Sequence, residues 1–368
     1  MDDFDLIPLN DLSRWTSAER DAIQSAIVDV VKSGNFIGGP QTRLLEQKLG
    51  KLVHGHHIVC VGNGTDALIL SLLALGVGNG DLVATVANAG GYATNAILQT
   101  GATPILIDVE IETAQMSSSD LSKKISGVPQ VKAVVVTHLY GLMADMNAIV
   151  DIAADHGVFL IEDCAQSIGA KLNGIPAGAF GDASTFSFYP TKNLGCLGDA
   201  GAVAMKSYVH AELLRSLAQY GWTSRYLVDY SFGMNSRIDE IQAAVLNVRF
   251  ESLEGRNRVR REIIRQFQSS LKSPRRMIFS DGGSFVGHLA VLISPERERD
   301  QKRLSEAGIQ TAVHFPLLDH QQSAWRNHFI GVSLPNSEIL SEKILTIPCF
   351  PLLTDDEILR LCKALSEL

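Results

Sequence analysis

The sequence has few cysteines and no arrangement that would use them for metal binding. Only five of the 368 residues are cysteine, scattered as Cys60, Cys164, Cys196, Cys349 and Cys362. None of them forms the closely spaced pairs that bind zinc, and their odd number does not suit a disulfide framework. The sequence therefore predicts no metal site, and its thiols indicate small core residues of a protein in the reducing cytoplasm.

Long hydrophobic runs are also lacking. Gly, Asp or His breaks the longest apolar stretches well before the roughly 20 residues that a helix needs to cross a bilayer. The first residues, Met1 to Asp5, are acidic and lack the basic start and apolar segment of a secretory signal. We therefore expect neither a membrane protein nor an exported one.

The chain has no excess of positive charge. It carries 32 Lys and Arg against 40 Asp and Glu, a formal net charge of −8. Nucleic acid binding needs clustered basic residues that neutralise phosphates, so we expect no nucleic acid partner. One basic run, residues 256–265, lies among acids such as Glu254 and Glu262, and we interpret it as the solvent-exposed face of a helix.

Between residues 58 and 205, short runs rich in Val and Ile alternate with segments of helical pattern. This alternation is typical of an α/β protein whose parallel sheet is covered by helices on both faces. The expected strands are 58–61, 82–87, 103–108, 133–138, 159–162, 184–188 and 201–205, and the expected helices include 65–75 and 146–156.

The rest of the chain indicates a second, smaller unit. Residues 239–267 carry apolar side chains at helical spacing and predict one long or bent helix. After Pro274, strand-like segments at 287–293, 311–315 and 344–347, with a helix near 299–307, predict an α+β domain. We therefore expect a large α/β domain over residues 1–250 and a small C-terminal domain over residues 251–368.

The candidate site begins with one lysine. Lys192 follows the strand-like run 184–188, in a turn of small and polar residues. An amine in such a turn can form a Schiff base, and burial would lower its pKa so that it acts as nucleophile and then as proton carrier. A lone lysine is more often a surface residue, but the neighbouring motifs favour the functional interpretation. Ser187, just upstream, could bind a phosphate.

Two other strand ends complement this lysine. Asp163 ends an apolar strand, where open α/β sheets bind ligands, and a buried carboxylate there needs a cation such as a pyridinium nitrogen. The turn from Gly62 to Thr65 opens a helix whose free amides suit a phosphate. Amine, carboxylate and amides together describe a pocket for pyridoxal 5′-phosphate (PLP).

Each of these motifs has an alternative interpretation. Asp163 could simply cap the turn that follows it. The turn with Gly62 and Gly64 also fits a dinucleotide-binding pattern, although the next strand is followed by Asn88 and not by the acid that would bind the ribose. A helix cap that binds nothing is the third possibility for this turn.

The chain resembles the DegT/StrS-type sugar aminotransferases of the fold-type I PLP-dependent superfamily over nearly its whole length. The matching blocks, in order, are residues 36–40, 64–68, 138–141, 162–166, 186–193, 233–239 and 308–316. The resemblance implies a large domain with a mostly parallel seven-stranded sheet, a smaller C-terminal α+β domain, and a homodimer with shared active sites.

The resemblance also implies roles for individual residues. Lys192 would hold PLP covalently, Asp163 would pair with its ring nitrogen and Gln166 would reach its ring hydroxyl. The phosphate would be held by Gly64, Thr65, Ser187 and, from the neighbouring subunit, Asn235. Arg237 would either orient the glutamate carboxylate or brace the loop of Asn235. The sugar side would involve Arg225, Tyr226, His314 and His320, although a lone histidine is more often structural.

One block departs from the family pattern. The family usually has an Asn-Thr-aromatic block after the second strand, with the aromatic ring stacked on the cofactor. This chain has Asn-Ala-Gly-Gly-Tyr-Ala-Thr at residues 88–94. When Ala93 and Thr94 are aligned, Gly91 takes the aromatic position and Tyr92 is displaced by one place. We expect Tyr92 to stack on the cofactor if the two glycines let the turn shift.

These observations predict an aminotransferase that carries the amino group from L-glutamate, through the aminated cofactor PMP, to a keto sugar, most simply a nucleotide-linked one. A free keto sugar or inosose is an alternative substrate. A PLP-dependent sugar dehydratase is disfavoured because such relatives carry His where this chain has Lys192. A non-catalytic sensor or binding module is disfavoured because Lys192, Asp163, Gln166 and Ser187 are all present.

Overall fold

The computed structural model describes residues 6–368. Met1 to Asp5, on which the expectation about an export signal rests, lie outside the described residues. Among the described helices, none has the length and apolar character needed to span a membrane.

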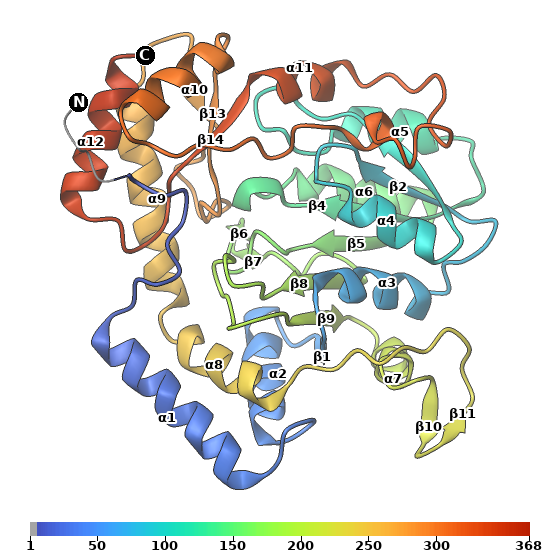
Figure 1. The fold of residues 1–368 in the computed structure, drawn as a ribbon. Coiled ribbons are helices and arrows are strands. Elements are labelled where there is room, and N and C mark those ends of the chain that lie inside the picture. Colours follow the sequence, from blue (N-terminus) through green and yellow to red (C-terminus); the bar gives the residue numbers. More distant parts are fainter. Residues whose placement is uncertain (1–5) are drawn as a thin grey trace.

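A seven-stranded sheet forms the centre of the molecule (Figure 1). Its strands lie in the order β1-β9-β8-β5-β4-β2-β3, and every neighbouring pair is parallel except the two pairs that involve β9. The predicted mostly parallel sheet is confirmed. The strands are β1 (His57–Val61), β2 (Leu82–Val86), β3 (Thr103–Ile107), β4 (Val131–Thr137), β5 (Phe159–Asp163), β8 (Ala183–Ser187) and β9 (Gly201–Met205).

Both faces of this sheet are buried. Successive side chains of a strand point to opposite faces, so Ile58 and Cys60 of β1 join one apolar cluster while Val59 and Val61 join another. Helices α3 (Gly64–Ala74), α4 (Tyr92–Gln99) and α7 (Tyr208–Leu217) cover one face. The other is covered by α2 (Pro40–Leu52), α5 (Ser118–Ile125), α6 (Met146–His156) and α8 (Glu240–Phe250). Burial on both faces explains the nearly continuous apolar runs in the sequence.

Local capping signals set the helix boundaries. Helix α6 spans the predicted residues because the Asp145 side chain accepts a hydrogen bond from the Ala148 N–H and Gly157 ends the helix with a φ of 63°. Helix α3 begins where the Asn63 side chain accepts from the Asp66 N–H. The other elements outside the two main sheets are the long helix α1 (Ser17–Ser33) and the short β6 (Lys171–Leu172), β7 (Ile175–Pro176), β10 (Trp222–Ser224), β11 (Leu227–Val228), η1 (Leu139–Gly141) and η2 (Asp319–Gln321).

A three-stranded antiparallel sheet lies beside the large one, at the upper left of Figure 1. It consists of β12 (Arg276–Met277), β13 (Ala290–Ile293) and β14 (Ile344–Ile347), accompanied by α9 (Leu253–Ser270), α10 (Arg297–Glu306), α11 (Pro335–Lys343) and α12 (Asp355–Ser366). The strand expected at 311–315 is reduced to a single bridge between Ala312 and Thr346, because His314 and Phe315 turn towards the cavity described below. The domain division at residue 250 stays a prediction.

Two expectations for residues 239–267 were wrong. The segment forms two helices, α8 and α9, because α8 packs on α1 and α2 whereas α9 packs on α12 and β12. The basic run on α9 is not simply a solvent-exposed face. Arg260 is only 5% exposed and donates from Nη1 to the Cys349 carbonyl at 2.7 Å. Helix α9 packs against α12 and β12, so part of its surface is covered.

Candidate functional site

The candidate site is a cavity of about 520 Å³ at the carboxyl ends of β4, β5 and β8. Open α/β sheets bind ligands at this edge, and the volume suits a small molecule. Eight residues that the sequence analysis selected line the cavity: Gly64, Thr65, Tyr92, Asp163, Gln166, Ser187, Lys192 and His314.

Asp163, which is buried, and Lys192, which is half-buried, are ionisable groups in this cavity. Burial lowers the pKa of Lys192, and Asp163 partly offsets that effect. Burial raises the pKa of Asp163, opposed by the hydrogen bond from Ala165 and by the charge of Lys192. The Asp163 carboxylate accepts from the Ala165 N–H at 3.1 Å and from the Thr137 hydroxyl at 3.3 Å. The turn-capping contact is therefore present, but both donors are neutral and leave the carboxylate able to bind a cation.

The side-chain amide of Gln166 has a defined orientation. Its Oε1 accepts the Tyr140 N–H at 2.6 Å. Its Nε2 group has no partner among the described residues, and it is therefore available as a donor at the cavity wall. Tyr140 also donates its hydroxyl to the His314 carbonyl at 2.6 Å, and so it links two residues that line the cavity.

The first turn of α3 forms the anion-binding end of the cavity. The amides of Gly64 and Thr65 have no acceptor within the described part of the chain, and the helix dipole favours an anion there. A Cβ on Gly64 would lie 2.7 Å from the Ser187 Cβ. Glycine at this position therefore lets the α3 turn approach the end of β8, which brings the Ser187 hydroxyl to the free amides.

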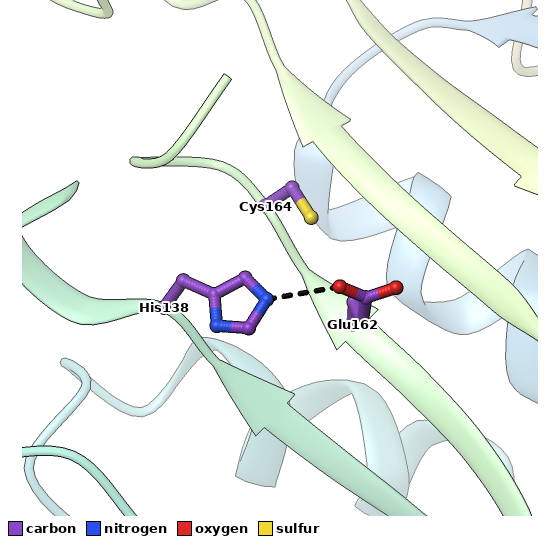
Figure 2. A group of neighbouring side chains, drawn as sticks. All are labelled: His138, Glu162 and Cys164. Carbon is purple, nitrogen blue, oxygen red and sulfur yellow. Dashed lines mark hydrogen bonds and ion pairs between the residues drawn. The ribbon is translucent and has the colours of Figure 1, made fainter. Parts of the chain in front are cut away.

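A buried cluster of His138, Glu162 and Cys164 flanks Asp163 on β5 (Figure 2). His138 Nε2 lies 3.0 Å from a Glu162 oxygen, while its Nδ1 accepts the Ala144 N–H at 3.2 Å. His138 therefore carries its proton on Nε2 and donates it to Glu162. Burial holds the pKa of Cys164 well above its usual range. Glu162 also accepts three backbone N–H groups, from residues 178, 180 and 181.

These contacts occupy the atoms of the cluster that would bind a metal ion. A zinc ligand must present a free lone pair or a thiolate, whereas here the imidazole and the carboxylate are already hydrogen-bonded and the thiol is protonated. We interpret the cluster as a hydrogen-bonded network that holds the end of β5, and with it Asp163, in place.

The remaining predicted residues lie outside the cavity of this single chain. Arg225 and Tyr226 lie on the hairpin β10–β11, where the Arg225 guanidinium stacks 4.9 Å from the Tyr226 ring centre. Asn235 is exposed and Arg237 is half-buried. His320 Nε2 lies 3.3 Å from a Glu338 oxygen and does not line the cavity.

The sequence analysis did not identify His288 and Phe315, which also line the cavity. Asn193 donates from Nδ2 to the Val286 carbonyl, so its Oδ1 faces His288 Nδ1 at 3.0 Å, and Nδ1 must carry the proton. Burial and then Lys192 hold the pKa of His288 well below its usual range. A single histidine before a strand offers no sequence signal for this role.

The burial of Asp319 leads us to expect that the stability of the protein depends on pH. It is 1% exposed, and burial raises its pKa to about 7 although the Thr94 hydroxyl donates to it. In the unfolded chain it titrates near about 4. Because the folded protein binds the proton of Asp319 more tightly than the unfolded chain does, the protonated carboxyl group adds to the unfolding free energy. This contribution is complete below about pH 4 and is lost as the pH rises through about 7. Between pH 5 and 7 the unfolding free energy of the wild type should fall by roughly 2 kcal/mol relative to Asp319→Asn.

Urea unfolding of the two proteins at pH 5, 6, 7 and 8 measures this difference. Asparagine keeps an oxygen that accepts the Thr94 hydroxyl, and every other titrating group is shared by the two proteins. Parallel curves for wild type and variant would show that Asp319 titrates normally.

Known proteins match nearly the whole chain. Residues 17–366 match the DegT/DnrJ/EryC1/StrS aminotransferase family. The UDP-N-acetyl-3-dehydro-alpha-D-glucosamine 3-aminotransferase of Acidithiobacillus ferrooxidans is 36% identical over 357 residues, which are 96% of each chain.

Two solved structures share the fold. DesV of S. venezuelae, in complex with a ketimine intermediate, is 33% identical with a TM-score of 0.94, covering 99% of this chain and 98% of that one. NtdA of Bacillus subtilis, with bound cofactor PMP, is 28% identical with a TM-score of 0.93, covering 99% of this chain and 85% of that one. The comparisons confirm the predicted family, fold class and enzyme class.

Proposed function

The chain belongs to the DegT/DnrJ/EryC1/StrS aminotransferase family, and we propose that it transfers an amino group from L-glutamate to a keto sugar carried on a nucleotide. The observation that carries this proposal is the cavity in which the Lys192 amine and the Asp163 carboxylate lie together at the ends of parallel strands. A nucleotide-linked substrate is supported by the relative whose name specifies a UDP-linked 3-dehydro sugar.

The residues of the cavity fit PLP. A buried carboxylate with only neutral donors, Asp163, suits a cationic ring nitrogen, and the free Nε2 of Gln166 suits an acceptor on the ring. The free amides of Gly64 and Thr65, with the Ser187 hydroxyl beside them, suit a phosphate. When bound, PLP supplies an aldehyde that takes up the amino group and a ring that accepts electrons.

Lys192 performs the proton transfers in this proposal. Burial lowers its pKa, which favours the neutral amine that can act as a base. Its Nζ would hold the aldehyde of PLP and, as the free amine, would take up the proton that leaves the Cα of glutamate; the same amine would serve the half-reaction with the sugar. Asp163 would pair with a protonated ring nitrogen, and Tyr92 and Phe315 form an aromatic wall on one side of the cavity.

We propose that two copies of the chain share their sites. The hairpin β10–β11 projects from the body at the lower right of Figure 1, and exposes apolar side chains that a second subunit would cover. These exposed side chains are Tyr226, Leu227, Val228 and Phe232. Asn235, exposed near the same segment, would then complete the phosphate site of the neighbouring subunit. Arg225, Tyr226, Arg237, His314 and His320 stay candidates for substrate contacts.

A reducing cytoplasmic setting is part of the proposal. All five cysteines are unpaired, and four of them are buried. Unpaired thiols are typical of proteins that function in a reducing compartment.

Spectroscopy of the purified protein tests the proposal. We expect a yellow protein whose visible absorption band is bleached by L-glutamate with release of 2-oxoglutarate, and restored by a nucleotide-linked keto sugar. D-Glutamate, which presents its Cα–H on the wrong side, should leave the band unchanged. A colourless protein that is indifferent to added PLP would contradict the proposed activity.

A further inference from the structure

The turn between β2 and α4 is built around two glycines. Gly90 and Gly91 have φ values of 79° and 77°, a region that residues with a Cβ rarely adopt. A Cβ on Gly91 would lie 2.8 Å from the Trp325 ring, and one on Gly90 would lie 2.9 Å from the Phe315 ring. Two aromatic rings from the C-terminal part of the chain therefore lie against the turn. The family pattern has an aromatic residue within the turn, at the position that Gly91 takes in this chain.

Asp319 forms hydrogen bonds to the residues on both sides of the turn. Its N–H donates to the Ala87 carbonyl at 2.9 Å, just after β2, and its carboxyl group accepts the Thr94 hydroxyl in the first turn of α4. All three residues are buried. The two contacts flank Gly90 and Gly91 and hold the backbone where the turn enters α4.

Trp325 is itself held by apolar packing. It lies against a small cluster that joins the end of β2 to the segment after η2, consisting of Ala87, Leu106, Leu318, Phe329 and Leu334. Its ring is half-buried. The buried cluster is closely packed and supports the Trp325 ring on one side, which restricts its movement against the glycine turn.

The residue that this turn presents is Tyr92, the first residue of α4. Its ring is 52% exposed, lines the cavity together with Lys192, and lies edge-on to Phe315 with ring centres 6.2 Å apart. The direction in which Tyr92 leaves the backbone is set by the two glycines immediately before it. A shift of the turn would therefore move this ring relative to the cavity.

We propose that Trp325 and Asp319 are positioning residues that lock the Gly90–Gly91 turn, so that Tyr92 presents its ring to the flat ring of the cofactor in place of an aromatic residue at position 91. The proposal rests on the proposed function in one respect, the presence of PLP in the cavity. Stacking on a flat ring is sensitive to ring orientation, which gives the turn a role in cofactor affinity.

Reconstitution of the apoenzyme with PLP tests this role. We expect Tyr92→Ala and Trp325→Ala each to weaken PLP affinity about tenfold and to change the visible circular dichroism of the bound cofactor. The double variant should be no weaker than Tyr92→Ala, because Trp325 acts through Tyr92. Trp325→Phe should retain wild-type affinity. Tyr208→Ala serves as the control, because Tyr208 packs on His57 at the amino end of β1, away from the strand ends that form the cavity.

Unchanged affinity in Trp325→Ala would overturn the proposal, and so would a double variant whose loss equals the product of the two single losses. A wild type that binds no PLP would instead refute the proposed function. If Trp325→Ala does not fold, Gly91→Ala decides. The new Cβ of Gly91→Ala would meet the Trp325 ring. If the indole lies on the turn, PLP affinity should fall further for Gly91→Ala than for Gly91→Ala combined with Trp325→Phe, whose smaller ring leaves more room. Equal losses of affinity in the two variants would overturn the proposal.

Discussion

Replacement of Lys192 by alanine should abolish transamination, with the glutamate half-reaction slowed by roughly 10⁴-fold. The amine at this position is both the group that binds the cofactor and the base that moves the proton. No other lysine lines the cavity within the described part of the chain. Stopped-flow absorbance with L-glutamate measures the effect on the wild type and on Lys192→Ala.

Covalent labelling gives the same prediction a second readout. Borohydride reduction of the wild type, followed by peptide mapping, should place the cofactor on Lys192, and Lys192→Ala should carry no adduct. Lys171→Ala is the matched control, because Lys171 is an exposed lysine on β6. An adduct on another lysine, or continued turnover of Lys192→Ala, would refute the assignment.

The second large effect is expected for Asp163→Asn, which should slow turnover by about 10²- to 10⁴-fold while the cofactor stays attached to Lys192. Asparagine can keep the contacts to the Ala165 N–H and the Thr137 hydroxyl, so the backbone turn is preserved. It has no charge to pair with the ring nitrogen, and losing one partner of a buried ion pair costs about 3–5 kcal/mol. Single-turnover kinetics and borohydride labelling measure the two quantities separately.

This variant also decides between the two interpretations of Asp163. If the residue only caps its turn, asparagine should replace it almost without loss, because Asn and Asp cap equally well. Asp145→Asn at the start of α6 provides that comparison, since Asp145 is an N-cap outside the cavity. Turnover of Asp163→Asn near the wild-type rate would favour the capping role alone.

Local rules accounted for the residues of the site that lie at strand ends. Asp163, Ser187 and the turn at Gly64 each follow an apolar strand that the sequence marks clearly, and parallel strands bring their carboxyl ends to one edge of the sheet. The cavity then contains them together, as expected. Lys192 joins them because only a short turn separates it from β8.

Local rules failed where packing between distant segments decides the outcome. Helical periodicity continues through residues 250–252, yet α8 and α9 pack on different partners and the chain breaks between them. The charge pattern placed Arg260 in solvent, whereas it is buried in the structure, where α9 packs against α12 and β12. In both cases tertiary contacts outweigh the local preference.

The amino-acid sequence alone determined the strands of the large sheet, the positions of α3 and α6, and the lysine and carboxylate of the site, because hydrophobic periodicity, capping residues and strand ends are encoded within a few neighbouring positions. Only the tertiary structure decided which distant side chains complete the cavity. His288, Asp319 and Trp325 lie on segments that carry no local signal for the site, and they reach the cavity and the α4 turn only because the C-terminal part of the chain packs against the large sheet. Packing of that kind depends on contacts across the whole chain, which no short stretch of sequence specifies.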